Sequence, residues 1–176
     1  MLKVTCGPMF AGKSTAIIKD SMDIEANKKL VIKPKTDTRT NSYITSHSGI
    51  LIPAVEMDPA HSSIIGLLNK DEDITDVFID EIQFFKPWII REIKTILFTL
   101  PREISVHVYG LDLDYKLEPW PIMQQLLPLA NQVTKLTARC AVCGQPASKT
   151  IRTSNLEELV LVGEGDHYEP RCNRHI

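Results

Sequence analysis

The sequence contains no long hydrophobic run. Its apolar stretches are short and interrupted by Lys, Asp, Glu or Pro, so no window approaches the roughly 18 consecutive apolar residues that a membrane-spanning helix requires. The first six residues also lack the charged leader, long apolar stretch and cleavage site of a secretory signal. These absences predict a cytoplasmic protein with no membrane partner.

An excess of charge of either sign is absent as well. The 20 Lys and Arg residues are balanced by 22 Asp and Glu residues, which gives a formal net charge of -2 and a pI near 6.2. Domains that bind nucleic acid usually carry a strongly basic surface. The balance therefore predicts no nucleic-acid partner and favours a small-molecule one. A length of 176 residues, 43% of them hydrophobic, suits one compact core with a small appendage.

Cysteine is scarce and unevenly distributed. Cys6 stands alone near the N-terminus at the end of an apolar segment, where a cysteine usually serves as a small buried side chain. The other three cysteines fall within the last 37 residues. In a reducing compartment such clustering favours metal binding over disulfides.

Two residue pairs with metal-ligand spacing stand in this last segment. Two residues separate Cys140 from Cys143, and two separate Cys172 from His175. The stretch between the pairs is long enough to fold back as a hairpin. Three thiolates and one imidazole complete a tetrahedron and leave no position for water, which is typical of structural Zn²⁺. The alternative is a set of unpaired cysteines and a terminal surface histidine.

The apolar pattern before residue 139 predicts a parallel α/β sheet. Short apolar runs alternate with helical patterns, as in strands joined by crossover helices. A helix is predicted over residues 14–26, and a second one from the apolar stripe between Phe85 and Leu100, with Pro87 in its first turn. The predicted strands are residues 2–6, 30–33, 77–80, 104–109 and 134–137.

Composition suggests two further divisions of the chain. The polar, β-branched stretch from Pro34 to Gly49 lacks apolar periodicity and is interpreted as a long loop, a type that is usually functional or disordered. Near Arg139 the α/β pattern gives way to the cysteine-bearing segment. We therefore expect an α/β core over residues 1–138 and a metal-binding subdomain over residues 139–176.

A glycine-rich loop with a lysine follows the first predicted strand. Residues 7–14 read GPMFAGKS and match the pattern G-x-x-x-x-G-K-[ST] between a strand and a helix. The glycines allow the backbone to wrap around a polyphosphate, so that N–H groups and the positive end of the helix point at the anion. Lys13 would reach the β- and γ-phosphates of ATP, and the Ser14 hydroxyl would bind Mg²⁺. The predicted ATP-binding residues here are Gly7, Pro8, Met9, Phe10, Ala11, Gly12, Lys13, Ser14 and Thr15.

Two carboxylates, Asp80 and Glu81, stand at the end of the apolar strand 77–80. Ligands of parallel α/β sheets bind at the carboxyl ends of the strands, so Asp80 is a candidate to hold Mg²⁺ opposite Ser14. Glu81 is a candidate general base that takes the proton from an attacking hydroxyl. An ATPase would use the same glutamate to activate water. The two motifs therefore predict phosphoryl transfer without identifying the acceptor.

Two alternatives stay open on these motifs alone. A RecA-type ATPase that acts on nucleic acid would share the loop and the carboxylates, although the acidic pI and the lack of interleaved basic and aromatic residues disfavour it. The second alternative is a zinc-ribbon module that binds nucleic acid or protein, with the glycine loop as a nucleotide switch. Positive charge near the cysteines supports it. That charge is interspersed with acidic residues, so the local field is mixed.

Several ordered segments resemble the type II thymidine kinases. GPMFAGKS is similar to the phosphate loop of that family, KPKTDTR continuing to SHSG to its flexible loop, and FIDEIQFF to its catalytic strand end. Further along, GLDLDYKLEPW is similar to its GLD-aromatic motif and LVGEGDHYEPRC to its tail. The resemblance runs from end to end of the chain. It implies a RecA-like P-loop NTPase sheet with a small C-terminal zinc-binding subdomain, the lasso.

The resemblance also implies roles for individual residues. Asp80 would contribute to the Mg²⁺ site and Glu81 would be the base, while Arg39 would approach the phosphates when the flexible loop orders. Aromatic faces would grip a flat pyrimidine, and backbone groups of the lasso would hold its edge. The residues implied to bind thymidine are Met9, Gln83, Phe84, Tyr115, Val162, Gly163 and Tyr168.

The implied reaction is transfer of the γ-phosphate of ATP to the 5′-hydroxyl of thymidine. The resemblance further implies a homotetramer and inhibition by dTTP. A kinase that acts on deoxyuridine or a broader pyrimidine set stays open, because a methyl-sized pocket difference changes discrimination only about 10- to 200-fold. Leu117 stands where the relatives often have glycine.

Overall fold

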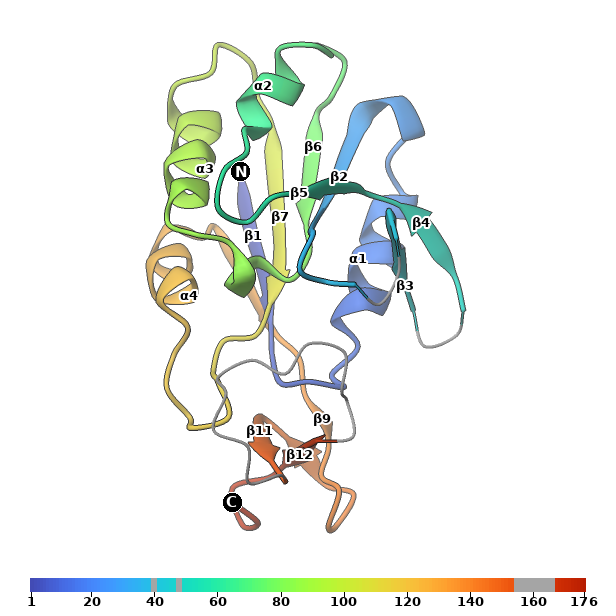
Figure 1. The fold of residues 1–176 in the computed structure, drawn as a ribbon, viewed down its shortest axis with the longest axis vertical. Coiled ribbons are helices and arrows are strands. Elements are labelled where there is room, and N and C mark those ends of the chain that lie inside the picture. The colour runs from blue at the N-terminus through green and yellow to red at the C-terminus, as the bar shows by residue number, and fades with distance from the viewer. Residues whose placement is uncertain (39–40, 47–48, 154–166) are drawn as a thin grey trace.

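A six-stranded parallel sheet forms the centre of the molecule (Figure 1). In the computed structural model, which describes residues 1–38, 41–46, 49–153 and 167–176, the strand order is β5-β2-β6-β7-β1-β8. Every pairing between neighbouring strands of this sheet is parallel. Its strands are β1 (Leu2–Cys6), β2 (Lys29–Pro34), β5 (Val55–Met57), β6 (Asp76–Ile79), β7 (Ser105–Gly110) and β8 (Gln132–Lys135). The predicted α/β class with a parallel sheet is confirmed.

Alternating side chains divide the core between the two faces of this sheet. The α-helices are α1 (Lys13–Met22), α2 (Ile64–Leu68), α3 (Trp88–Phe98) and α4 (Pro121–Leu126), and the 3-10 helices are η1 (Ala26–Lys28), η2 (Ile82–Phe84) and η3 (Leu127–Leu129). Successive strand residues point to opposite faces. Val77 and Ile79 of β6 join the apolar side chains of α2, α3 and α4, whereas Phe78 between them packs with α1. Helices therefore cover both faces.

The predicted helices form, with one boundary wrong. In α3 the apolar stripe is buried as expected, with Pro87 at the N-cap, where its missing N–H costs little. The helix predicted to reach residue 26 ends at Met22, because the chain turns through η1 to enter β2. No Gly or Pro marks this stop in the sequence. None of the helices among the described residues has both the length and the hydropathy needed to cross a membrane.

The stretch from 34 to 49 contains structure that its composition did not predict. Tyr43–Thr45 forms β3, which pairs antiparallel with β4 (Leu51–Pro53). Ile44 and Ile52 are buried in the same cluster as α1. The interpretation as an uninterrupted loop was therefore wrong for Tyr43–Thr45, because a single apolar residue between polar ones shows its role only when the partner strand and the helix are in place.

The last strand of the sheet is displaced by two residues from its prediction. β8 covers Gln132–Lys135, whereas residues 134–137 were expected. All four of its residues are exposed because β8 lies at the edge of the sheet and pairs only with β1. Because neither face of this edge strand is buried, its sequence shows little hydrophobic pattern from which the ends of the strand can be predicted.

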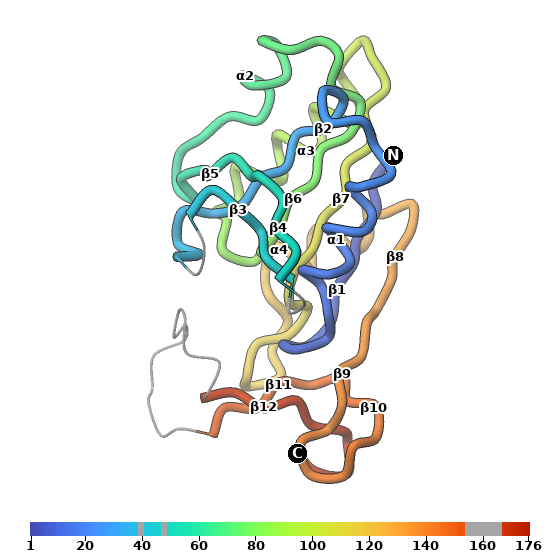
Figure 2. Tube along the Cα trace, turned by 90° about the vertical axis from the view of Figure 1, so that its right-hand side faces the viewer, coloured from blue at the N-terminus to red at the C-terminus, as the bar shows by residue number. Residues whose placement is uncertain are grey.

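The cysteine-bearing segment lies beyond the carboxyl ends of the central strands, as Figures 1 and 2 show from two directions. Its short strands pair antiparallel, β9 with β10 and β11 with β12, in agreement with the expected fold-back. They are β9 (Ala138–Arg139), β10 (Pro146–Ala147), β11 (Lys149–Arg152) and β12 (Tyr168–Arg171). We call the described part of residues 138–176 the tail.

Candidate functional site

The carboxyl edge of the parallel sheet gathers the motifs that were found separately in the sequence. The loop after β1 carries residues 7–14, β6 is followed by Asp80 and Glu81, and β7 leads into Leu111 and Asp112. β7 lies between β1 and β6 in the sheet, so the three segments are neighbours. Clefts at this edge are where parallel α/β sheets bind ligands.

The loop of residues 7–14 follows a path that glycine permits. Gly7 has a φ of 147°, and a Cβ atom there would lie 2.5 Å from the carbonyl oxygen of Leu136. Gly12 is left-handed with a φ of 86° and directly precedes α1. Phe10, although not glycine, also has a positive φ of 63°. The tight path ends at the N-terminus of α1, where free N–H groups and the helix dipole favour an anion.

Lys13 is folded back over the loop that precedes it. Its Nζ donates hydrogen bonds to the carbonyl oxygens of Gly7 at 3.2 Å and Pro8 at 2.7 Å, and the residue is only 8% exposed. Ser14 beside it is half-buried. The ammonium group is thus held at the loop by the loop's own backbone. Of the other predicted residues, Pro8 is buried, Met9 and Ala11 are half-buried, and Phe10 and Thr15 are exposed.

Asp80 and Glu81 have different environments although they are adjacent. Asp80 is 2% exposed, its N–H donates to the carbonyl of Ile32 at 2.9 Å, and its Oδ1 accepts the N–H of Glu81 at 2.9 Å. Glu81 is half-buried and left-handed, with φ 47° and ψ 44°, at the N-cap of η2. The chain therefore turns at Glu81, so that one carboxylate belongs to the strand end and the other to the start of η2.

Gln83 and Phe84, both predicted to bind substrate, occupy different positions next to this turn. Gln83 is 4% exposed, and its Nε2 donates to Oε2 of Glu81 at 2.6 Å. Phe84 is half-buried and meets the ring of Trp120 edge to face, with centroids 6.3 Å apart. The glutamine therefore contacts the candidate base directly, while Phe84 contacts the loop that follows β7.

That loop, residues 111–120, is held by its own polar side chains. Oδ1 of Asp114 accepts the N–H groups of Lys116 at 2.8 Å and Glu118 at 2.9 Å. Leu117 adopts a left-handed φ of 67°. This conformation favours glycine, which explains in physical terms why glycine suits this position. Asp112 is 8% exposed and pairs with Lys135 of β8 at 2.6 Å, across the end of the sheet.

The tail contacts this edge through β11. Oγ1 of Thr150 accepts the backbone N–H of Met9 at 2.9 Å, which joins the tail to the loop of residues 7–14. The guanidinium carbon of Arg152 lies 3.9 Å from the ring centroid of Tyr115 and 5.0 Å from that of Tyr168. Arg152 also donates to the Tyr168 hydroxyl. The two tyrosines predicted to bind substrate are thus brought together around one cation.

Thr150 and Arg152 were missed by sequence reasoning. Both lie on a strand of only four residues, KTIR, which shows no motif and contains nothing to distinguish it from an ordinary edge strand. The available signal was their position between the two metal-ligand pairs, a segment whose ends the predicted metal site would hold together. Arg39, Val162 and Gly163, also predicted as site residues, lie outside the described residues.

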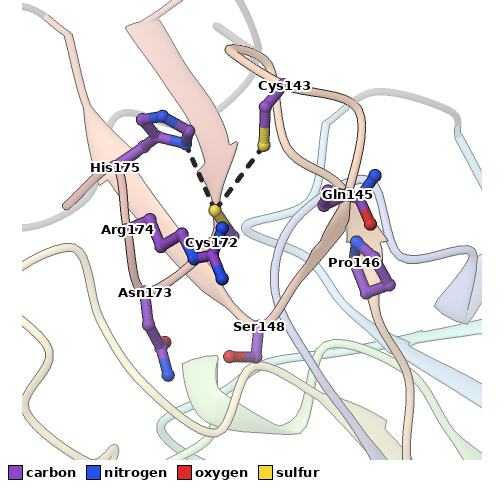
Figure 3. A pocket seen from close by; sticks show the side chains of 8 residues that line it. All are labelled: Cys143, Gln145, Pro146, Ser148, Cys172, Asn173, Arg174 and His175. Atoms are coloured by element: carbon purple, nitrogen blue, oxygen red, sulfur yellow. Dashed lines mark hydrogen bonds between the residues drawn. The ribbon is translucent and has the colours of Figure 1, made fainter.

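The four predicted metal ligands come together within the tail. One ligand atom from each of Cys140, Cys143, Cys172 and His175 lies within 4.8 Å of all the others. The Sγ atoms of Cys143 and Cys172 are 3.7 Å apart, and Nδ1 of His175 is 3.2 Å from Sγ of Cys172 and 3.6 Å from that of Cys140. Figure 3 shows Cys143 and His175 converging on Cys172. Ligands about 2.3 Å from a tetrahedral Zn²⁺ lie about 3.8 Å apart. The group could therefore hold a structural metal ion.

Backbone geometry around the cluster favours thiolate ligands. Burial opposes ionisation of the Cys140 thiol, but N–H groups of Cys172, Cys143 and Val142 outweigh it and bring the pKa of Cys140 to about 5. The turn that makes this possible ends at Gly144, which is left-handed and donates its N–H to the Cys140 carbonyl at 2.8 Å. In contrast, burial and the nearby Asp112 raise the pKa of the isolated Cys6, which is 2% exposed and behaves as the predicted core residue.

Comparison with known proteins identifies relatives over the whole length. A family model described as thymidine kinase matches residues 1–176. A thymidine kinase of Coprothermobacter proteolyticus is 40% identical over 183 residues, which cover 99% of this chain and 89% of that protein. A thymidine kinase of Onion yellows phytoplasma is 36% identical over 184 residues, which cover 99% of this chain and 85% of that protein.

Proposed function

The chain belongs to the thymidine kinase family, and on that premise we propose that it transfers the γ-phosphate of ATP to the 5′-hydroxyl of thymidine, giving dTMP and ADP. The observation that carries the proposal is the meeting of three elements at one sheet edge. They are the Lys13 loop, the Asp80–Glu81 turn and the tyrosine-bearing tail.

The triphosphate of ATP binds along residues 7–14 in a RecA-like P-loop arrangement. Its charge is matched by the N–H groups of the loop, by the N-terminus of α1 and by Lys13. Arg39 adds a second cation on the phosphates. In the structure, Lys13 donates to the carbonyls of Gly7 and Pro8. When ATP binds, Lys13 exchanges these hydrogen bonds for bonds to phosphate oxygens.

Mg²⁺ would be held by the Ser14 hydroxyl and the Asp80 carboxylate. Both are oxygen donors, which a hard cation prefers, and the burial of Asp80 at the strand end suits a charge that a cation neutralises. When bound, Mg²⁺ screens the negative charge that develops on the phosphates during transfer.

Glu81 accepts the proton of the 5′-hydroxyl as that oxygen attacks the γ-phosphorus. Its half-buried carboxylate is fixed at the start of η2, close to the strand end that carries Asp80. A general base must be held within hydrogen-bond reach of the proton that it removes. The left-handed backbone at Glu81 is the kind of strained geometry that clusters at functional positions.

Thymidine lies between the β7 loop and the tail. Phe84, Tyr115 and Tyr168 supply flat apolar surface for the pyrimidine, Met9 adds an apolar edge, and Val162 and Gly163 offer backbone groups for its polar edge. Arg152 stands between the two tyrosines and holds them at this position.

In the tail, Cys140, Cys143, Cys172 and His175 would hold Zn²⁺ through three thiolates and one imidazole, which leaves no position for water and suits a structural role. Held in this way, residues 139–176 would form a metal-stabilised subdomain beside an α/β core of residues 1–138. We further propose that this protein is cytoplasmic, that it forms a homotetramer and that dTTP inhibits it.

The test is to incubate the purified protein with Mg·ATP and each deoxynucleoside in turn and to measure the 5′-monophosphates formed. We expect dTMP to form fastest. Comparable rates with deoxyuridine would establish a broader pyrimidine kinase. ATP turnover that requires DNA and yields no monophosphate would overturn the proposal in favour of a nucleic-acid-dependent ATPase.

A further inference from the structure

We infer that Gln83 is a positioning residue for the Glu81 carboxylate and does not select the base of the nucleoside. The inference rests on the proposed function, because it assigns Gln83 a part in proton removal. The resemblance to the thymidine kinases implies a place for Gln83 in the thymidine pocket. In the structure, the two ends of its side-chain amide contact Glu81 and the backbone of Leu111.

Both ends of the Gln83 amide are engaged by protein groups whose polarity is known. Oε1 lies 3.1 Å from the backbone nitrogen of Leu111, which can only donate. Nε2 lies 2.6 Å from Oε2 of Glu81, a carboxylate oxygen that accepts its hydrogen bond. A flipped amide would place two donors together at one end and two acceptors at the other. The orientation is therefore fixed, with the NH₂ group directed at the candidate base.

The space that Gln83 occupies depends on Gly110. A Cβ atom at position 110 would lie 2.5 Å from Oε1 of Gln83 and 2.7 Å from Cγ2 of Ile82. Only glycine at the end of β7 allows the amide to approach the backbone this closely, and the resulting site leaves Gln83 just 4% exposed. A buried amide fixed in this way can hold the Glu81 carboxylate in one position.

The backbone of Glu81 is fixed from the other side. Its N–H donates to Oδ1 of Asp80 at 2.9 Å, and its φ of 47° sets the direction of the side chain. The remaining freedom is rotation about the side-chain bonds, which the Gln83 hydrogen bond restricts. Reactions that depend on a placed base lose rate when that base samples other rotamers.

This arrangement predicts a change in turnover and not in substrate affinity. In Gln83→Met the side chain keeps its length but loses both hydrogen bonds. We expect kcat to fall about 10- to 100-fold, a part of the roughly 10²- to 10⁴-fold that a positioned base contributes. The KM for thymidine should change less than about threefold, since uniform substrate binding is not lost. A matched control is Gln124→Met, at an exposed position of α4, which should leave both constants unchanged.

A second variant gives a signature that a purely structural role would not produce. In Gln83→Glu the new carboxylate faces Glu81 and repels it when ionised, but donates a hydrogen bond as the amide does when protonated. The deficit in kcat relative to wild type should therefore shrink as the pH is lowered. Metal content and thermal melting of both variants show whether they fold.

The outcomes separate the two proposals. A rise of more than about tenfold in the thymidine KM of Gln83→Met, with kcat retained, would show that Gln83 binds the nucleoside and would overturn the inference. So would unchanged constants, or a deficit in Gln83→Glu that is constant with pH. If the wild-type protein forms dTMP, these results leave the proposed function intact. If the wild-type protein forms none, both proposals fail.

Discussion

The sheet core and the tail are stabilised by different means. Up to residue 137 the described chain buries a large apolar cluster on each face of one sheet, with side chains such as Phe78 and Ile89 fully enclosed. In the described part of the tail, the buried apolar side chains are only Ala138, Cys140 and Ala147. Its strands have two to four residues each. The core therefore buries many more apolar side chains than the described part of the tail.

This difference bears on the two halves of the proposed site. Its phosphate side is part of the core, because residues 7–14 directly follow β1 and lead into α1. Its proposed nucleoside side includes Tyr168, which lies four residues before the proposed metal ligand Cys172. We therefore expect one half of the site to depend on the folding of the sheet and the other to depend on metal binding.

The strongest test of this contrast is the variant Cys143→Ser. Structural Zn²⁺ contributes about 10–16 kcal/mol in zinc-finger peptides, far more than the few buried side chains of the tail can replace. We expect the loss of bound metal, loss of amide protection in β11 and β12, and a fall of more than about 100-fold in kcat/KM for thymidine, the scale on which misplaced substrate-positioning groups act. Core amides should stay protected.

The control for this experiment is Cys6→Ala. Cys6 is buried in the core and is not one of the four clustered ligand residues, so this variant should keep its metal and its tail protection. Equal loss of protection in core and tail of Cys143→Ser would contradict the separation of the two regions.

The converse change is Phe78→Ala in the core. Phe78 is fully buried in the α1-side cluster and stacks on His107 with ring centroids 4.4 Å apart. Truncation of a buried Phe costs about 3–5 kcal/mol because it removes contacts and leaves a cavity. We expect a lower denaturation midpoint for the core in urea, with metal still bound one to one in the folded protein. Loss of metal before core unfolding would show that the tail depends on the core more than this account allows.

A smaller effect is expected where the two regions meet. In Thr150→Val the buried side chain keeps its shape but no longer accepts the N–H of Met9. The net contribution of such a hydrogen bond is about 0.5–1.5 kcal/mol. If the lost hydrogen bond lowers the barrier to metal release by this free energy, a chromogenic chelator should remove the metal from Thr150→Val about 2- to 10-fold faster than from wild type. Thr134→Val, on the exposed edge strand, is the matched control and should not alter this rate.

The smallest effect concerns the β7 loop. Leu117 has a φ of 67°, which costs an ordinary L-residue about 1–2 kcal/mol. Leu117→Gly removes that strain but adds freedom to the unfolded chain, so we expect a net stabilisation of at most about 1 kcal/mol in thermal unfolding. The neighbouring Lys116→Gly, where no positive φ occurs, should destabilise instead. The opposite order of the two variants would show that the turn does not store strain.

What the sequence predicted well is local and strongly patterned. β1 was predicted with its observed ends because a short apolar run leads directly into a glycine motif. α3 was predicted because its buried residues repeat at helical spacing, and the metal cluster because two spaced pairs leave few arrangements. In each case the signal lies in the spacing of residues within a short segment or, for the metal cluster, within two short segments.

What the sequence did not predict depends on contacts between distant segments. β3 gains its buried residue Ile44 only through pairing with β4 and packing on α1. Likewise, Thr150 meets Met9 across 141 positions of sequence, and Arg152 meets Tyr115 only after the tail folds back. Gln83 was assigned by similarity to the nucleoside pocket, whereas its contact with Glu81 required the close approach at Gly110.

The most direct test of the central claim is the rate of dTMP formation by Glu81→Gln in a single turnover with saturating Mg·ATP. Removal of the general base should lower this rate about 10²- to 10⁴-fold relative to wild type. The dissociation constant for ATP should stay within about threefold, because residues 7–14 and Lys13 are unchanged. A wild-type rate in Glu81→Gln would contradict the account, since the carboxylate that the sheet edge, Asp80 and Gln83 hold in place would then take no part in the reaction.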